Sequence, residues 1–216
     1  NDGGIAPMSL VTYQDAFPWT QSIREEILGL RMPPWQAEDG FGRFRNGHAL
    51  SAEQMDMILE WSSGGYPQGP RDQAPEPPTL TQEWALGEPS LIGEMSETFL
   101  FDSGLSETVR FFVLPAEITN EQMISAIDFQ PGARAVIRSA SVFLDTNGTA
   151  RTLDSKDAAP GFSEVNDNNF PISPPVAVWV PGQAPVFMES AGHIVPAGAE
   201  IVLRIHYKKT WITEGQ

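Results

Sequence analysis

The spacing of apolar residues divides the chain into a helical part followed by a β part. In residues 1–66 the apolar positions recur at helical spacing, with Ile23, Ile27 and Leu30 standing at i, i+4 and i+7. Two consecutive prolines, the first of them Pro33, must end this helix because proline lacks an amide donor and restricts the residue before it. The pattern therefore predicts a helix that closes near Leu30.

A second helix is predicted to begin at Ser51. The serine hydroxyl can accept from the backbone of Gln54, whose side chain can return the bond, so the two residues form a capping box. The apolar stripe that follows contains Met55, Ile58 and Leu59. Met57 and Trp61 form an adjacent stripe, and we expect both to pack in the core. Gly64 ends the helix.

Prolines mark the border between two domains. Five of them stand in residues 67–82, a density that excludes regular structure and favours an extended, semi-stiff connection. The sequence thus predicts a small all-α domain in residues 1–66, a linker in residues 67–82 and a second domain in residues 83–216.

The second domain carries β-branched and aromatic runs bounded by Gly, Pro or Asn. These runs cover residues 109–114, 134–144, 176–180, 185–188 and 200–207. Since no convincing helix separates them, we expect an antiparallel β-sandwich, jelly-roll-like in its arrangement. Asn147 and Gly148 predict a tight hairpin turn, and the polar stretch from residue 154 to residue 169 predicts a long surface loop.

Charge and composition exclude several classes of function. The 216 residues carry 13 Lys+Arg against 28 Asp+Glu, a net charge of −15 that argues against nucleic acid or anionic lipid as a general partner. No cysteine is present, which excludes disulfides, thiolate metal sites and cysteine nucleophiles within these residues. The longest strongly apolar run, residues 111–116, is far shorter than the ~20 residues of a membrane-spanning helix.

Few residues could carry chemistry. The three histidines are His48, His193 and His206, and a single imidazole cannot hold a metal alone. Strand alternation places Arg204 on the same face as His206, where the cation disfavours both a bound metal and a protonated imidazole. An acidic stretch could offer oxygen ligands to calcium or could be an ordinary solvated loop; it contains Asp154, Asp157, Glu164, Asp167 and Asn169.

Two sets of short motifs resemble known families. The first half resembles the cytochrome-c-like module of certain bacterial multidomain proteins in Gly4–Leu10, in Met32–Trp35 and in Leu50–Gln54 with the stretch up to Pro67. The second half resembles the copper type II, ascorbate-dependent monooxygenases, the family of peptidylglycine α-hydroxylating monooxygenase. The motifs that carry this second resemblance are Pro131–Ile137, Trp179–Gly182, Val195–Gly198 and Ile205–Tyr207.

The first resemblance implies a covalently bound haem. It places a Cys-x-x-Cys-His segment just before Gly3 and makes Met32 a candidate axial ligand of the iron. Covalent attachment needs two thiols and a proximal imidazole, and residues 1–216 contain no cysteine. Haem c is therefore expected only if the motif lies upstream, in which case the chain is an electron carrier seen incompletely.

The second resemblance implies a copper site that has lost its ligands. The family carries adjacent histidines at the positions of Arg138 and Ser139, and His206 alone matches the third imidazole. A guanidinium, always charged and without a free lone pair, cannot replace an imidazole ligand. The family's second copper site lies on a following domain, beyond Gln216. His206 is thus expected to be a vestigial metal ligand, and hydroxylation is not expected.

These expectations favour a non-catalytic accessory or assembly subunit that binds no cofactor. The resemblances place it in the periplasm or otherwise outside the cytoplasm, docking on a larger membrane-associated assembly such as a redox or photosynthetic complex. Candidate interface residues are Trp35, Phe41 and Phe44 in the aromatic loop. The alternatives are the haem c carrier or copper monooxygenase with ligands outside residues 1–216, and a binding module for calcium or a small ligand.

Overall fold

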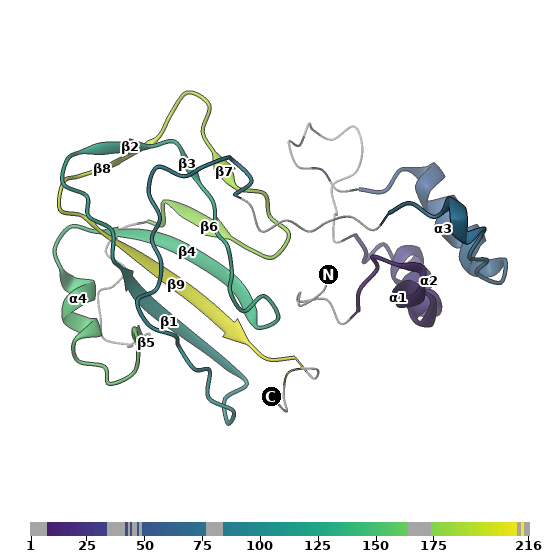
Figure 1. The fold of residues 1–216 in the computed structure, drawn as a ribbon, viewed down its shortest axis with the longest axis horizontal. Helices are drawn as coiled ribbons and strands as arrows, with labels where there is room; N and C mark the ends of the chain where they lie inside the picture. The colour runs from purple at the N-terminus through teal and green to yellow at the C-terminus, as the bar shows by residue number, and fades with distance from the viewer. Residues whose placement is uncertain are drawn as a thin grey trace. The chain divides into compact units, whose positions relative to one another are not determined.

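The computed structural model describes residues 8–33, 42, 44, 47, 49–76, 84–163, 174–210 and 213. They form two compact units, one containing the described residues up to 76 and the other those from 84 onward. Figure 1 shows helices in the first unit and mostly β-strands in the second. The predicted order of a helical part followed by an antiparallel β part is confirmed.

The helical unit is built from short elements. In chain order these are α1 (Tyr13–Ala16), the 3-10 helix η1 (Phe17–Trp19), α2 (Thr20–Leu28) and α3 (Ala52–Ser63). The predicted capping box begins α3: the Gln54 amide donates to Ser51 Oγ (3.2 Å), and the Ser51 amide donates to Gln54 Oε1 (2.9 Å). No helix among the described residues has the length and apolarity that crossing a membrane requires.

The first long helix ends at Leu28, two residues earlier than predicted. The amides of Leu30 and Arg31 donate back to the carbonyls of Ile27 and Glu26, and Leu30 has a φ of +52°. This left-handed residue turns the chain away, so that Leu30 is 67% exposed whereas Ile27 is 5% exposed. The prediction that Leu30 continues the buried stripe is therefore wrong.

Aromatic rings replace much of the aliphatic core expected for this unit. The Tyr13 ring lies 5.5 Å from Phe17, and Trp61 lies 6.3 Å from Tyr66. The Tyr13 hydroxyl also donates to the Tyr66 carbonyl (2.9 Å). Met57 lies outside this aromatic cluster and is 64% exposed, so its predicted place in the core is wrong. Among the described residues of this unit, Ile27 is the one buried apolar side chain.

The proline-rich stretch contains one turn of regular structure. The 3-10 helix η2 (Arg71–Gln73) lies where the sequence predicted only extended chain. Such a turn needs few bonds, and two suffice here: Gln73 donates to the Pro70 carbonyl and Ala74 to that of Arg71. The turn fits because residues 71–74 are the longest proline-free interval between residues 67 and 78.

The β unit is organised around one five-stranded antiparallel sheet (Figure 1). Its spatial order is β5 (Phe162–Ser163), β1 (Glu107–Leu114), β9 (Glu200–Lys208), β4 (Ile137–Asp145) and β6 (Ala177–Trp179). The described residues of the unit also form two ribbons: β2 (Gln122–Ile124) with β8 (His193–Val195), and β3 (Ala126–Ile127) with β7 (Val186–Phe187). The central strand β9 covers the β run predicted for residues 200–207.

Both faces of the main sheet bury apolar side chains. One face packs the cluster of Phe112, Leu114, Ile137, Ala140, Leu203, Ile205 and Tyr207. The other face packs Phe111, Phe143 and Val202 against Ala150 and Phe162. A third cluster lies beside the β2–β8 ribbon and contains Ile118, Val195 and Ala199. Strand alternation explains the two faces, because neighbours such as Phe111 and Phe112 point to opposite sides.

A short helix stands where the sequence predicted a hairpin. Asn147 and Gly148 do turn the chain, but α4 (Thr149–Asp154) follows, and β4 pairs with β6 and β9. The buried Asp145 carboxylate accepts from the amides of Asn147 (2.9 Å) and Ala150 (2.6 Å), which starts the helix. The hairpin prediction and the expectation of no helix between the strands are both wrong.

Replacing Phe111 by alanine should destabilise the β unit strongly. The ring is 1% exposed and stacks on Phe162 at 5.2 Å. Removing a buried phenylalanine costs about 3–5 kcal/mol because a cavity remains. Urea unfolding followed by circular dichroism should show this loss, whereas Met123→Ala, at a 67% exposed position, should change the free energy of unfolding little. Equal losses in the two variants would contradict the assigned core.

Candidate functional site

The structure brings together two of the three positions that the resemblance assigns to copper ligands. Ser139 on β4 and His206 on β9 are direct register partners in the antiparallel ladder. The register shifts between Ile137 and Ser139, so Arg138 occupies an irregularity beside them. Directly opposed residues share a face, with Cβ atoms about 4.5–5.5 Å apart. The positions that the resemblance assigns to one ligand set are thus neighbours in the fold, and only one of them is an imidazole.

A carboxylate holds the single imidazole. His206 Nε2 lies 2.6 Å from Glu107 Oε1, and Lys208 Nζ lies 2.9 Å from the other carboxylate oxygen. Glu107 begins the neighbouring strand β1, and it is register partner of Lys208. In metal sites a ligating histidine commonly bonds a carboxylate through one ring nitrogen and the metal through the other. Here the pair belongs to an ion-pair cluster, which we call the Glu107 cluster.

The charges of this cluster perturb the pKa of Glu107. The hydrogen bond from Lys208, and after it the bond from His206, hold the pKa of the Glu107 carboxyl below its usual value. A carboxyl with a depressed pKa in the folded state stabilises the fold at pH values above its unfolded pKa. That contribution is lost as the pH falls through the folded pKa.

Arg138 cannot ligate a metal, because a guanidinium offers no free lone pair, and its side chain is held by one hydrogen bond. Its Nη1 donates to the Ala135 carbonyl (3.0 Å), while its Nη2 is buried and has no hydrogen-bond partner among the described residues. Burial lowers the pKa of the guanidinium, and the Glu107 carboxylate opposes that shift. The side chain therefore adds a positive charge near His206, which disfavours a second cation there.

The other predicted site residues do not converge. Met32 is exposed in the helical unit, and Phe44 is exposed as well. The interface candidates Trp35 and Phe41 lie outside the described residues, as does His48. His193 lies on the β2–β8 ribbon as register partner of Ile124.

The acidic stretch is only partly described. Glu164, Asp167 and Asn169 lie outside the described residues. Asp154 and Asp157 line one hollow of about 220 Å³ together with Glu97. Asp157 is bound to the buried Arg110 (3.2 Å). Among the residues that the structure describes, no three carboxylates or imidazoles are grouped as metal ligands.

Sequence reasoning missed Glu107 because the partner of an imidazole can stand anywhere in the chain. Glu107 and His206 are 99 residues apart and meet only through the pairing of β1 with β9. The run predicted from the sequence begins at residue 109, so Glu107 lies outside it, and the structure extends the strand by two residues to include it. The contact of Arg204 with the Phe111 ring (5.9 Å) follows from the same register.

Replacing Lys208 by methionine should raise the pKa of Glu107 toward its usual value. The change removes the bond that contributes most to the depressed pKa, whereas His206→Phe removes the smaller contribution and should raise it less. Carbon-13 NMR titration of the Glu107 carboxyl measures both variants against the original chain. An unchanged titration midpoint in Lys208→Met would contradict the cluster.

Comparisons with known proteins do not assign this chain to a family. Family models, curated proteins and solved structures give no significant match. The described geometry therefore stands on its own: an antiparallel sheet whose central strand carries one imidazole, bound to a carboxylate and facing a serine.

Proposed function

We propose that the chain is a non-catalytic accessory or assembly subunit, built on a scaffold related to the copper monooxygenases and docking on a larger assembly outside the cytoplasm. The observation that carries this proposal is the pairing of Ser139 with His206. Strands β4 and β9 hold the positions that the resemblance assigns to ligands, and the side chains there are a serine, an arginine bound to the Ala135 carbonyl and one imidazole.

The packing of the β unit supports a two-layer scaffold. Phe129 and Trp179 pack at 5.0 Å over one face of the main sheet, where Ile127 of β3 and Val186 of β7 also line a small hollow. The β2–β8 ribbon packs at the end of β4 and β9 through the third cluster. We propose that these ribbons are the second layer of a small, jelly-roll-like sandwich.

The residues present do not fit a c-type haem by themselves. The chain contains no thiol to attach the porphyrin. Met32, the proposed axial ligand, is exposed, and the space beside α3 is filled by the aromatic cluster of Tyr13, Phe17, Trp61 and Tyr66. We propose that the helical unit is a haem-free relative of the cytochrome-c-like modules and derive no electron transfer through it.

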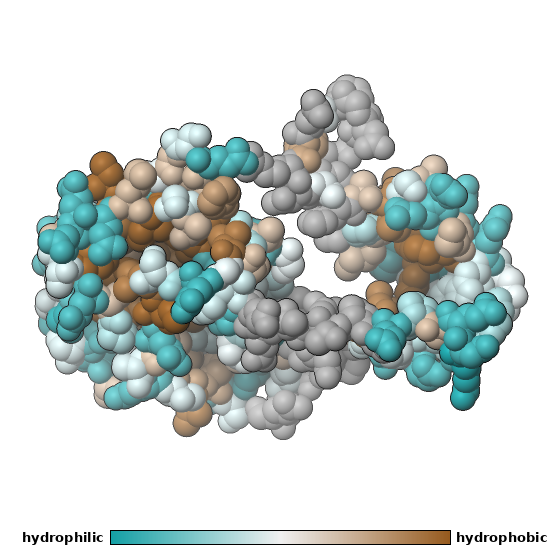
Figure 2. All heavy atoms as spheres, turned by 45° about the horizontal axis from the view of Figure 1, so that its top comes forward, coloured by the Kyte–Doolittle hydropathy of each residue, from teal (hydrophilic) through white to brown (hydrophobic). Residues whose placement is uncertain are grey.

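The helical unit also exposes apolar side chains suited to docking. Figure 2 shows brown apolar atoms at the surface of this unit between teal polar ones. Leu28, Leu30 and Met32 are all exposed at the end of α2. The backbone of Leu30 supports this choice. Its φ of +52° lies in the left-handed region that favours glycine, and its exposed side chain makes little contribution to the stability of the fold, so folding alone does not explain a leucine here. We propose that these three residues form the docking patch.

Introducing imidazoles should rebuild a metal site at the paired strands. The double variant Arg138→His with Ser139→His should bind Cu(II) stoichiometrically, because His206 lies opposite residue 139 and is oriented by Glu107. The matched control is Arg138→His with Ser141→His, since Ser141 faces Arg204 instead. Isothermal titration with copper measures both. Equal binding by the two variants, or none by either, would contradict the assignment of these ligand positions.

Replacing Leu30 by glycine should stabilise the helical unit and at the same time weaken its docking. Relief of the left-handed leucine should stabilise the helical unit by roughly 1 kcal/mol, while the loss of the apolar side chain should weaken docking. Native electrophoresis of membrane extracts measures whether the full chain migrates with a larger assembly. Leu100→Gly, at another exposed leucine in the β unit, is the control. Undiminished assembly with Leu30→Gly would overturn the docking patch.

A further inference from the structure

At the outer edge of the main sheet, the hydrogen bonds of β6 show which of its backbone groups point away from the sheet. Among the described residues β6 is the last strand, paired on one side with β4. The Val142 carbonyl accepts from the Val176 amide (2.8 Å), so the backbone groups of Val142 face β6. Because backbone groups alternate in direction along a strand, Ala177 and Trp179 face β4. The groups of Val178 point to the opposite, outer side.

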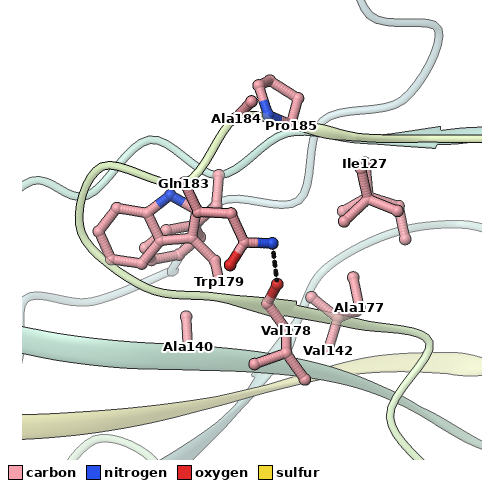
Figure 3. A pocket seen from close by; sticks show the side chains of 11 residues that line it. Ile127, Ala140, Val142, Ala177, Val178, Trp179, Gln183, Ala184 and Pro185 are labelled. Atoms are coloured by element: carbon pink, nitrogen blue, oxygen red, sulfur yellow. Dashed lines mark hydrogen bonds between the residues drawn. The ribbon is translucent and has the colours of Figure 1, made fainter. Parts of the chain in front are cut away.

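One glutamine side chain bonds this outer edge at two points. Gln183 Nε2 donates to the Val178 carbonyl (3.0 Å), and the Val180 amide donates to Gln183 Oε1 (3.2 Å). Figure 3 shows the Gln183 amide directed at the Val178 carbonyl. A residue on a parallel neighbouring strand makes the same pair of bonds, to the carbonyl before and the amide after its partner. Gln183 therefore occupies the edge as an added strand would.

The surroundings of this edge are apolar and uncharged. Val178 and Val180 are exposed, as is Phe187 on β7. The hollow beside Gln183 has a volume of only about 10 Å³, which holds at most one water molecule. It cannot seat a ligand, so the recognition features are the strand edge and the exposed valines.

We propose that the outer edge of β6 is a pairing surface for a second copy of this chain, and that Gln183 keeps this surface closed in the free protein. An unpaired strand edge is a template for another strand. In a chain of net charge −15, residues 174–188 contain no charged residue, so two copies can approach here without like-charge repulsion. β6 has three residues, and two such strands bury far less than the ~1,200 Å² of a stable interface. The pairing is therefore weak and depends on concentration.

Sedimentation velocity over a concentration series tests this proposal. The original chain should remain monomeric over the series. Gln183→Ala should self-associate over the same series, with a dissociation constant at least tenfold below the highest concentration at which the original chain is still monomeric. Gln122→Ala, at an exposed glutamine on β2, is the matched control and should match the original chain. Hydrogen exchange of the Val180 amide should accelerate in Gln183→Ala at low concentration and slow again when the variant associates.

Two further variants decide the remaining outcomes. Adding Val178→Lys to Gln183→Ala should restore the monomer, because a lysine on an edge strand opposes pairing. If Gln183→Ala does not fold, Gln183→Met, which keeps the side-chain length without the two bonds, is measured in its place. A folded variant that stays monomeric at every concentration would overturn the proposal. Association that Val178→Lys leaves unchanged, or that Gln122→Ala reproduces, would overturn it equally.

Discussion

The register of the central strand β9 determines both the core and the candidate site. β9 pairs with β1 on one side and with β4 on the other, so each of its residues from Ile201 to Tyr207 has two neighbours fixed by register. The residues of one parity, such as Leu203 and Ile205, enter a buried cluster. The opposite parity carries Val202 into the second cluster and Arg204 and His206 toward the more polar end of that face. A shift by one residue would exchange the faces and expose the core. Maintenance of the core therefore also fixes His206 opposite Ser139.

This coupling explains how a ligand set can disappear while the scaffold remains. Leu203, Ile205 and Tyr207 fill a buried cluster on one face of the sheet, whereas Arg204 and His206 lie on the opposite face and are less buried. Substitutions at Arg138, Ser139 or His206, the proposed ligand positions, open no cavity in the clusters around Phe111 and Phe112, because none of the three belongs to those clusters. Fold and site are separable in this physical sense.

The two units differ in how their apolar side chains are used. The β unit buries three clusters of apolar residues, whereas Ile27 is the one buried apolar residue among those described in the helical unit. Isolated helices shorter than about 12–15 residues are marginal in water, and α3 has 12 residues. Ring packing between Trp61 and its neighbours supplements this small core. An assembly partner that covers the exposed leucines would add the burial that the unit itself does not provide.

Much of the fold could be predicted because long runs carry strong patterns. Strands β1, β4 and β9, and the capping box at Ser51, follow directly from local residues. Strands β2 and β8 could not be predicted, since each has only three residues and gains stability only by pairing with the other. The helix α4 was missed because Asn147 and Gly148 suit a hairpin equally well, and the buried Asp145 carboxylate decides the outcome.

The candidate site was predictable only in part, for the same physical reason. The resemblance grouped Arg138, Ser139 and His206. The contact of Glu107 with His206 and the hydrogen bond of Gln183 to Val178 depend on how the chain folds in three dimensions. No local pattern records which carboxylate reaches an imidazole across a sheet. The sequence thus shows which side chains could bind a metal or an ion, whereas the register of the strands is needed to know which residues they contact.

The metal and haem content of the native protein, purified from its source, is the most direct test of whether the scaffold binds either cofactor. We expect an absorption spectrum without a Soret band and copper far below one atom per chain by elemental analysis. A Soret band, or one copper atom per chain that survives dialysis and is lost on replacing His206 by alanine, would contradict a scaffold that has given up its cofactors.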